Sequence, residues 1–248
     1  MRYFLELAYH GAAYHGWQRQ PNAISVQEKV EECLSTLTRK RMEVVGAGRT
    51  DTGVHAKQLF AHFDAQTELD QEFVFRVNSI LPKDIALISI KAVKPEAHAR
   101  FDALSRSYEY HVVLEKDPFS LGTAFYVKRE LEVGKMNEAA GILMHYSDFK
   151  CFSRSRTDVK TYQCRIDHAY WEEMDKELVF HIKADRFLRN MVRAIVGTLL
   201  EIGAGKMKVE DLRKVIESRN RCEAGASVPA HGLYLTKVEY PGEIFLDL

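Results

Sequence analysis

The sequence predicts an α+β fold, in which two ferredoxin-like split β-α-β halves join into one mixed, mainly antiparallel sheet with helices packed on it and a cleft at the seam. Segments of period two, typical of strands, alternate with segments of helical period, and the order β-α-β-β-α-β occurs twice. With 46% hydrophobic residues over 248 positions, the chain is also long enough to bury the core that such a sheet needs.

The first half, residues 1–105, begins with a strand in which Tyr3, Leu5 and Leu7 alternate on one face. Ser25 to Glu28 has the form of a capping box, which marks the start of a helix. An apolar stripe follows at helical spacing: Val26, Val30, Cys33, Leu34 and Leu37. The remaining expected elements are strands at 43–47, 58–63 and 85–90 and a helix at 71–80.

The second half, residues 106–248, repeats the order of elements without repeating the residues. We expect a strand at 107–114, a helix at 133–146, strands at 164–171 and 178–184, two further helices, and a strand at 233–239. The seam is placed near residues 104–106, and a substrate cleft is expected along it.

Several classes of protein are disfavoured by the composition. The first apolar run is short and contains Glu6, unlike a signal peptide, and no stretch is long enough to span a membrane. The four cysteines are widely spaced, which argues against a zinc site and against a disulfide framework. We therefore expect a cytoplasmic protein.

The charge is balanced over the chain but not along it. Lys and Arg together number 35, as do Asp and Glu. Residues 150–165 contain five basic residues and one acid, and residues 186–221 contain nine basic residues and four acids. Such an excess fits the phosphate backbone of a nucleic acid, and it equally fits a solvated helical surface. Charge alone leaves both interpretations open.

A glycine-rich loop, Gly46-Ala47-Gly48-Arg49-Thr50-Asp51-Thr52-Gly53-Val54-His55, follows a short apolar strand. Such a loop allows backbone and side chains to approach a ligand closely. It differs from the dinucleotide-binding pattern because Asp51 stands in the place of the last glycine. On this segment alone, Asp51 is either a functional carboxylate or a residue that closes an Asx turn.

Two later segments carry side chains suited to a flipped nucleobase. Tyr108 and Tyr110 lie on the same side of a predicted strand, where a ring can stack on a base or pack in the core. Arg186, Arg189 and Arg193 are expected to share one helical face beside an apolar stripe. An arginine set against Asp51 would keep that carboxylate ionised and oriented, whereas the alternative is a basic surface helix with no partner.

Three motifs together resemble those of bacterial tRNA pseudouridine synthase A. They are Gly48-Arg49-Thr50-Asp51-x-Gly53-Val54-His55, Arg106-x-Tyr108-x-Tyr110 and Phe187-Leu188-x-x-Met191-Val192-Arg193. The similarity covers nearly the whole chain and includes Gly16-Trp17-Gln18-Arg19-Gln20, His98-Ala99-Arg100-Phe101 and Gly232-Leu233-Tyr234-Leu235. Several spaced motifs in the same order are far more specific than one.

The resemblance implies a catalytic carboxylate at Asp51, a base-stacking ring at Tyr108 and an Asp-pairing guanidinium at Arg193. It implies that Arg49 enters the RNA stem and helps to displace the target nucleotide. The implied substrates are uridines 38, 39 and/or 40 of the tRNA anticodon stem-loop, and the implied enzyme is a homodimer without cofactor or metal. The sequence departs from the family where Thr52 replaces a usual Ala and His10 a usual Asp.

Two other functions fit parts of these patterns. A non-catalytic RNA-binding protein would also present aromatic side chains on a sheet, although the Arg/Lys-Gly-Phe/Tyr-Gly/Ala-Phe pattern of RNA-recognition domains is missing. A nucleosidase would cut the same glycosidic bond with water, usually with two carboxylates, whereas Asp51 has no second acid in its loop.

Overall fold

The computed structural model of the chain describes residues 1–66, 68–69, 71–155 and 159–246. The chain packs into two compact units, and each is described by itself. Unit 1 comprises Met1–Leu104 with Tyr234–Leu248, and unit 2 comprises Ser105–Leu233. That residues 1–105 and 106–248 are separate domains stays a prediction. Arg156 and Asp158, counted in the first basic segment, lie outside the described residues.

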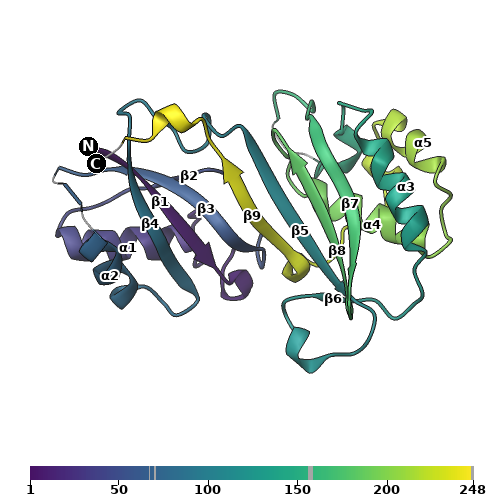
Figure 1. The fold of residues 1–248 in the computed structure, drawn as a ribbon, viewed down its shortest axis with the longest axis horizontal. Coiled ribbons are helices and arrows are strands. Elements are labelled where there is room, and N and C mark those ends of the chain that lie inside the picture. Colours follow the sequence, from purple (N-terminus) through teal and green to yellow (C-terminus); the bar gives the residue numbers. More distant parts are fainter. Residues whose placement is uncertain (67, 70, 156–158, 247–248) are drawn as a thin grey trace. The chain divides into compact units, whose positions relative to one another are not determined.

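The sheet of unit 1 has β1 (Arg2–Tyr9) at its centre, flanked by β3 (His55–Asp64) and β4 (Ile85–Val93) (Figure 1). Both neighbours are antiparallel to β1, and Leu5 is opposite Ala61 on one side and Ile90 on the other. The short strand β2 (Val45–Gly46) pairs antiparallel with β3. The C-terminal strand β9 (Leu233–Glu239) pairs parallel with the start of β3, so two segments far apart in sequence meet there.

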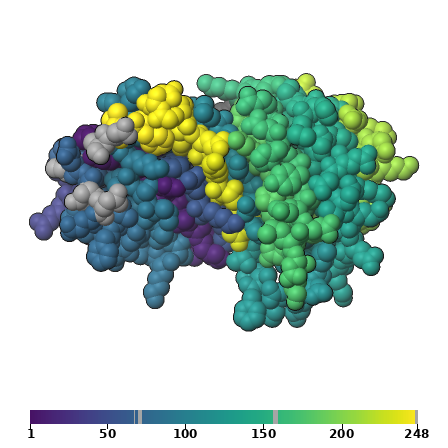
Figure 2. All heavy atoms as spheres, in the orientation of Figure 1, coloured from purple at the N-terminus to yellow at the C-terminus, as the bar shows by residue number. Residues whose placement is uncertain are grey.

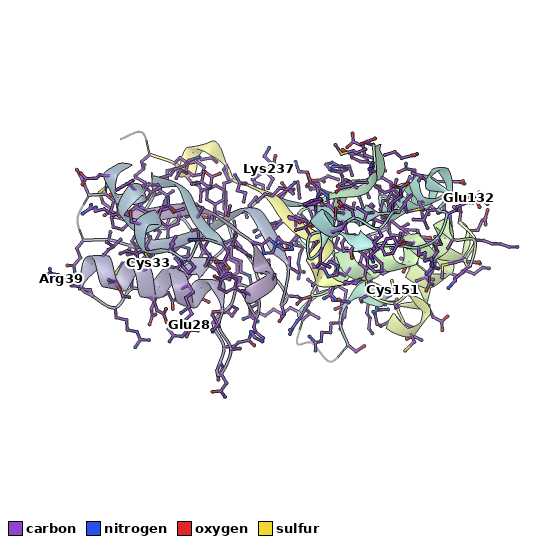
Figure 3. The ribbon with its side chains drawn as sticks, turned by 90° about the horizontal axis from the view of Figure 1, so that it is seen from below. Glu28, Cys33, Arg39, Glu132, Cys151 and Lys237 are labelled. Carbon is purple, nitrogen blue, oxygen red and sulfur yellow. The ribbon has the colours of Figure 1, made fainter. Side chains whose placement is uncertain are left out.

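Helices α1 (Val26–Thr38) and α2 (Gln71–Ile80) contact each other, and α2 contacts β4 (Figure 1). Helix α1 begins as predicted, because the Ser25 hydroxyl accepts the N–H of Glu28 at 3.3 Å. It ends where Arg39 turns into the left-handed region, and Figure 3 shows Glu28, Cys33 and Arg39 along its length. Four residues of the predicted apolar stripe are buried: Val26, Val30, Cys33 and Leu34.

In unit 2 the central strand is β8 (Glu177–Ala184), with β5 (Ser105–Val113) and β7 (Ile166–Met174) antiparallel on its two sides. The short strand β6 (Phe125–Tyr126) is parallel to β5. The described part of the unit also contains the α-helices α3 (Val133–Leu143), α4 (Met191–Gly203) and α5 (Asp211–Ser218). Helix α3 packs on β7 and on α4, and α4 is buried over nearly all of its length.

The α+β class with mainly antiparallel strands is confirmed. The expected strands and helices are present, with ends that differ by a few residues. The split ferredoxin-like halves, their joining and the cleft at the seam stay predictions. In Figure 2 the C-terminal segment of unit 1, drawn in yellow, lies at the surface of that unit. None of the helices in the described ranges has the length and apolar character that crossing a bilayer requires.

The expectation that Arg186, Arg189 and Arg193 share one helical face is wrong. Helix α4 begins at Met191, and Asn190 just before it has a φ of 67° in the left-handed region. Arg186 and Arg189 therefore lie in the segment that leads into the helix. The periodic apolar residues Leu188 and Met191 continue across this boundary, so a pattern of burial does not reveal where the helix begins.

Candidate active site

The Asp51 loop, residues 47–54, connects two paired strands of unit 1. It leaves β2, whose Gly46 is opposite Ala61, and it returns directly into β3 at His55. A glycine loop that cradles a dinucleotide or a nucleotide phosphate stands instead between a strand and a helix. The hairpin context excludes that alternative for this loop.

Asp51 begins a tight turn that is closed by its own main chain. The N–H of Val54 donates to the carbonyl of Asp51 at 3.2 Å, and Gly53 has a φ of 80°, which strongly favours glycine. The turn does not require the carboxylate for its closure. This weakens the interpretation of Asp51 as a residue that merely closes an Asx turn.

Thr50 fixes the loop immediately before Asp51. Its hydroxyl accepts the backbone N–H of Trp17 at 3.1 Å and lies 2.9 Å from the phenol oxygen of Tyr9. Gly16 packs so closely that a Cβ there would lie 2.2 Å from the Thr50 carbonyl oxygen. Residues from the first strand and the following loop thus hold the backbone of Asp51 in place.

The flanks of the loop differ in how tightly they pack. Gly46 lies against the buried Trp17 indole, and a Cβ at Gly46 would be 2.3 Å from Nε1. Gly48 has open space around its Cβ position. The next residue, Arg49, is exposed, and its Nε donates to Oε1 of Gln18 at 3.0 Å. The loop therefore presents a cationic side chain to solvent from a rigid base.

His55 ends the loop and is buried. Its Nδ1 accepts the backbone N–H of Gly11 at 3.0 Å, so a proton on the neutral ring resides on Nε2. The ring stacks on Tyr234 at 4.6 Å and lies 4.3 Å from the ring of His10. His10, one of the two departures from the family pattern, thus contacts the end of the Asp51 loop.

In unit 2, Tyr108 and Tyr110 lie on β5, as predicted. Tyr108 is half-buried, and its ring meets that of Phe187 edge to face at 5.1 Å. Tyr110 is fully buried and donates its hydroxyl to the carbonyl of Pro229 at 2.8 Å. Burial raises the pKa of Tyr110, and the charge of Arg193 acts in the opposite direction. Tyr110 is therefore a core residue, and Tyr108 is the member of the pair that is partly accessible.

Arg193 lies in the first turn of α4 and is paired twice with Val228. Its Nε donates to the Val228 carbonyl at 2.7 Å, and its own carbonyl accepts the Val228 N–H at 3.2 Å. The alternative of a surface helix arginine with no partner is thus wrong. A guanidinium has five donors, and the bond from Nε orients the plane in which the terminal nitrogens lie.

The structure brings Asp51 and Arg49 together in one loop of unit 1 and places Tyr108 and Arg193 in unit 2. The meeting of all four around one nucleotide stays a prediction. A surface cavity of about 400 Å³ in unit 2 contains none of them; its lining includes Ile142 and His145 near α3, and Val209 and Arg213 near α5. Across the described ranges, no group of three or more His, Cys, Asp or Glu side chains is arranged to hold a metal ion.

Sequence reasoning assigned no role to the residues that support two of these side chains, Asp51 and Arg193. Thr50 and Trp17 fix the Asp51 turn, and Val228 orients Arg193. Each forms a contact between segments separated by more than thirty residues. For Val228 the available signal was the preceding small-residue segment Ala224-Gly225-Ala226-Ser227, which suggests close backbone packing.

The family model described as tRNA pseudouridine synthase matches residues 143–241. A tRNA pseudouridine synthase A from Bacteroides fragilis is 55% identical over 247 residues, which cover 98% of each chain. The chain belongs to the tRNA pseudouridine synthase A family. The relative named tRNA pseudouridine synthase A in Porphyromonas gingivalis is 51% identical over 99% of each chain. A more distant tRNA pseudouridine synthase A 2 from Clostridium perfringens is 39% identical over 95% of this chain and 98% of its own.

Membership of the tRNA pseudouridine synthase A family confirms the resemblance stated from the motifs. It also confirms the expectation of an isomerase of the pseudouridine synthase class, and it disfavours the binding protein and the nucleosidase. The relatives match along their full length, so both units of this chain belong to the shared enzyme.

Proposed function

We propose that this enzyme converts uridine to pseudouridine at one or more of positions 38, 39 and 40 of the tRNA anticodon stem-loop, with Asp51 as the catalytic carboxylate. The full-length similarity to proteins named tRNA pseudouridine synthase A carries the proposal of a tRNA substrate. The rigid hairpin loop supports the choice of Asp51, because its backbone is fixed by bonds that do not use its carboxylate.

The reaction exchanges one glycosidic bond for another. The bond from uracil N1 to ribose C1′ breaks, the base turns in the pocket, and C5 bonds to C1′ while the proton on C5 is released to solvent. N1 finally takes up a proton, so atoms balance without an oxidant or reductant. Such an isomerisation requires a shaped, water-poor pocket and a group that acts on the flipped nucleotide, which is the role of Asp51.

Three further side chains have roles in this proposal. Tyr108 stacks on the flipped uracil, an interaction worth about 1 to 3 kcal/mol per base, and thereby offsets part of the cost of extrusion. Arg193 pairs with Asp51 and orients its carboxylate. Arg49, exposed beside Asp51, enters the RNA stem and helps to displace the nucleotide. The enzyme acts in the cytoplasm as a homodimer. If sedimentation shows a monomer and that monomer still forms pseudouridine, the proposed dimer is refuted.

The decisive experiment uses tRNA with tritium at uracil C5. Asp51→Asn is expected to bind this RNA with normal affinity and to release no tritium. The matched control is Asp175→Asn, because Asp175 lies in the exposed turn between β7 and β8 with a φ of 44°, which asparagine tolerates. This control should release tritium at the wild-type rate. Normal release by Asp51→Asn would remove Asp51 from the mechanism.

The positions are tested separately with anticodon stem-loops that carry a single uridine at 38, 39 or 40. Pseudouridine in at least one of these three stem-loops, detected by carbodiimide labelling and primer extension, is the expected result. Modification at a different uridine would refute the proposed positions while leaving the chemistry intact.

A further inference from the structure

The segment Ala224–Pro229 lies directly against helix α4 and leads into β9. A Cβ on Gly197 of α4 would lie 1.8 Å from the Ala226 carbonyl oxygen, and a Cβ on Gly225 would lie 2.8 Å from the Thr198 nitrogen. Two glycines, one on each side of the contact, thus permit the two backbones to touch. The hydroxyl of Thr198 adds a bond, because it accepts the Gly225 N–H at 2.9 Å.

Two carbonyls of this segment accept hydrogen bonds from side chains of α4 and β5. Val228 accepts the Nε of Arg193 at 2.7 Å, and Pro229 accepts the hydroxyl of Tyr110 at 2.8 Å. The position of the segment therefore determines where the Arg193 guanidinium is held. A shift of the Val228 carbonyl by one ångström would either break this bond or move the guanidinium with it.

Ser227 is the point at which the segment is fixed. Its hydroxyl oxygen accepts two donors, Nδ2 of Asn190 at 2.6 Å and a terminal nitrogen of Arg221 at 2.8 Å, which use both of its acceptor positions. Arg221 also donates to the carbonyls of Ala224 and Gly225 at 3.1 and 3.0 Å. One guanidinium thus holds the first part of the segment in a fixed turn.

Asn190 connects this arrangement to the start of the helix that carries Arg193. It precedes Met191, the first residue of α4, in the left-handed conformation that asparagine tolerates better than most residues. Its amide therefore ties the beginning of α4 to Ser227, one residue before Val228. Both ends of the Arg193–Val228 pair are tied through a single hydroxyl.

We propose that Ser227, held by Asn190 and Arg221, is a positioning residue for catalysis that acts through the Arg193–Val228 contact. The proposal rests on the role of Arg193 given above and extends it to three residues that do not touch the substrate. Loss of the Ser227 hydroxyl releases both donors at once. The two direct bonds between Arg193 and Val228 remain, but the pair is no longer tied to Asn190 and Arg221 and can shift within the site. The expected defect lies in the chemical step, because the arginine is misplaced rather than lost.

The test is a double-mutant cycle measured by single-turnover tritium release from C5-labelled tRNA. We expect Ser227→Ala to slow release about 10-fold, since a misplacement of about 1 Å in a catalytic site is costly, with RNA affinity changed less than about 2-fold. Ser227→Thr retains the hydroxyl and should restore most of the rate. In an Arg193→Lys background, Ser227→Ala should add little, because residues that act through one group are not additive.

Additive losses in the double variant would overturn the proposal, as would a parallel loss of RNA affinity. A wild-type rate for Ser227→Ala would also overturn it. If Ser227→Ala does not fold, Asn190→Gly replaces it, because glycine tolerates the left-handed backbone and has no side chain that could bond to Ser227. If Arg193→Lys alone releases tritium at the wild-type rate, the role of Arg193 in the proposed function is refuted. A slow Arg193→Lys with a wild-type rate for Ser227→Ala would refute only the positioning role of Ser227.

Discussion

The buried imidazole of His62 provides a pH-sensitive contact in unit 1. Its Nδ1 accepts the backbone N–H of Ala99 at 3.1 Å, which requires the neutral ring. Burial, with smaller contributions from the charges of His98 and Arg2, lowers the pKa of His62 from 6.5 to about 4. The folded protein therefore binds a proton at this site less readily than the unfolded chain does.

The sign of the pH dependence follows from this lowered pKa. The contribution to stability is fully present above pH 6.5 and is lost as the pH falls toward 4. At about 1.4 kcal/mol per pKa unit, the free energy of unfolding should fall by about 2 kcal/mol between pH 7.5 and pH 5 from this group. Urea unfolding at the two pH values measures it.

The control for this prediction is His62→Asn, which retains an acceptor without a titrating ring. The variant should lose most of the difference between the two pH values that the wild type shows. An equal difference in both proteins would show that the dependence comes from other groups, such as His98, whose pKa is also lowered.

At the level of residues, the sequence predicts side chains with chemistry better than it predicts their supports. Asp51 and Tyr108 stand out when they occur together with the other motifs. Taken alone, a single acid among glycines can close an Asx turn, and a tyrosine on a strand can pack in the core. Ser227 and Arg221 do not stand out, since polar residues of these types are common on any surface. Thr50 lies in a motif, but the motif does not show that it supports Asp51. Their roles depend on tertiary contacts, which a local pattern does not encode.

Alanine substitutions at two helical glycines should have opposite effects on stability, because one glycine packs against the Ala224–Pro229 segment and the other has open space around its Cβ position. Gly197→Ala should destabilise the protein by about 1 to 3 kcal/mol, because its Cβ would lie 1.8 Å from the Ala226 carbonyl oxygen and one backbone must move. Gly141→Ala in α3 meets no atom within 4 Å and should stabilise by about 0.5 to 1 kcal/mol through helix propensity.

Urea unfolding of both variants and the wild type tests this pair. Because the two substitutions are chemically identical and both lie inside helices, their difference isolates the packing contact. Stabilisation by Gly197→Ala would mean that the Ala226 carbonyl is not held against the helix, contrary to the close approach described here.

At the level of elements, periodicity predicts the strands and helices but not their partners. The alternating pattern of 233–239 predicts β9 in its full length, whereas its parallel pairing with His55 and Ala56 is a contact across nearly the whole chain. The start of α4 was misplaced for a related reason. Leu188 and Met191 are both buried, one on each side of Asn190. The hydrophobic period therefore extends back beyond Asn190, although the helix begins only at Met191.

For the whole molecule, the distribution of charge decides how RNA binding depends on salt. The chain has no net charge, but residues 186–221 have five more basic than acidic residues by the counts given above. If this segment contacts phosphates, each neutralised phosphate releases counterions, and the affinity falls as salt rises. If it is only a solvated surface, removing one of its charges leaves that dependence unchanged.

Arg189 and Lys214 form a matched pair for this test. Both are exposed, and Lys214 is held by Asp211 at 2.7 Å on α5. Arg189→Ala should weaken tRNA binding and reduce the slope of log affinity against log salt by about 1, as expected for the loss of one phosphate contact. Lys214→Ala, which removes an exposed cation bonded to Asp211, is the comparison variant and should leave the slope unchanged. Filter binding of an anticodon stem-loop between 50 and 200 mM salt, roughly the range over which such slopes are resolved, measures both. Equal slopes in the wild type and the two variants would show that Arg189 makes no phosphate contact.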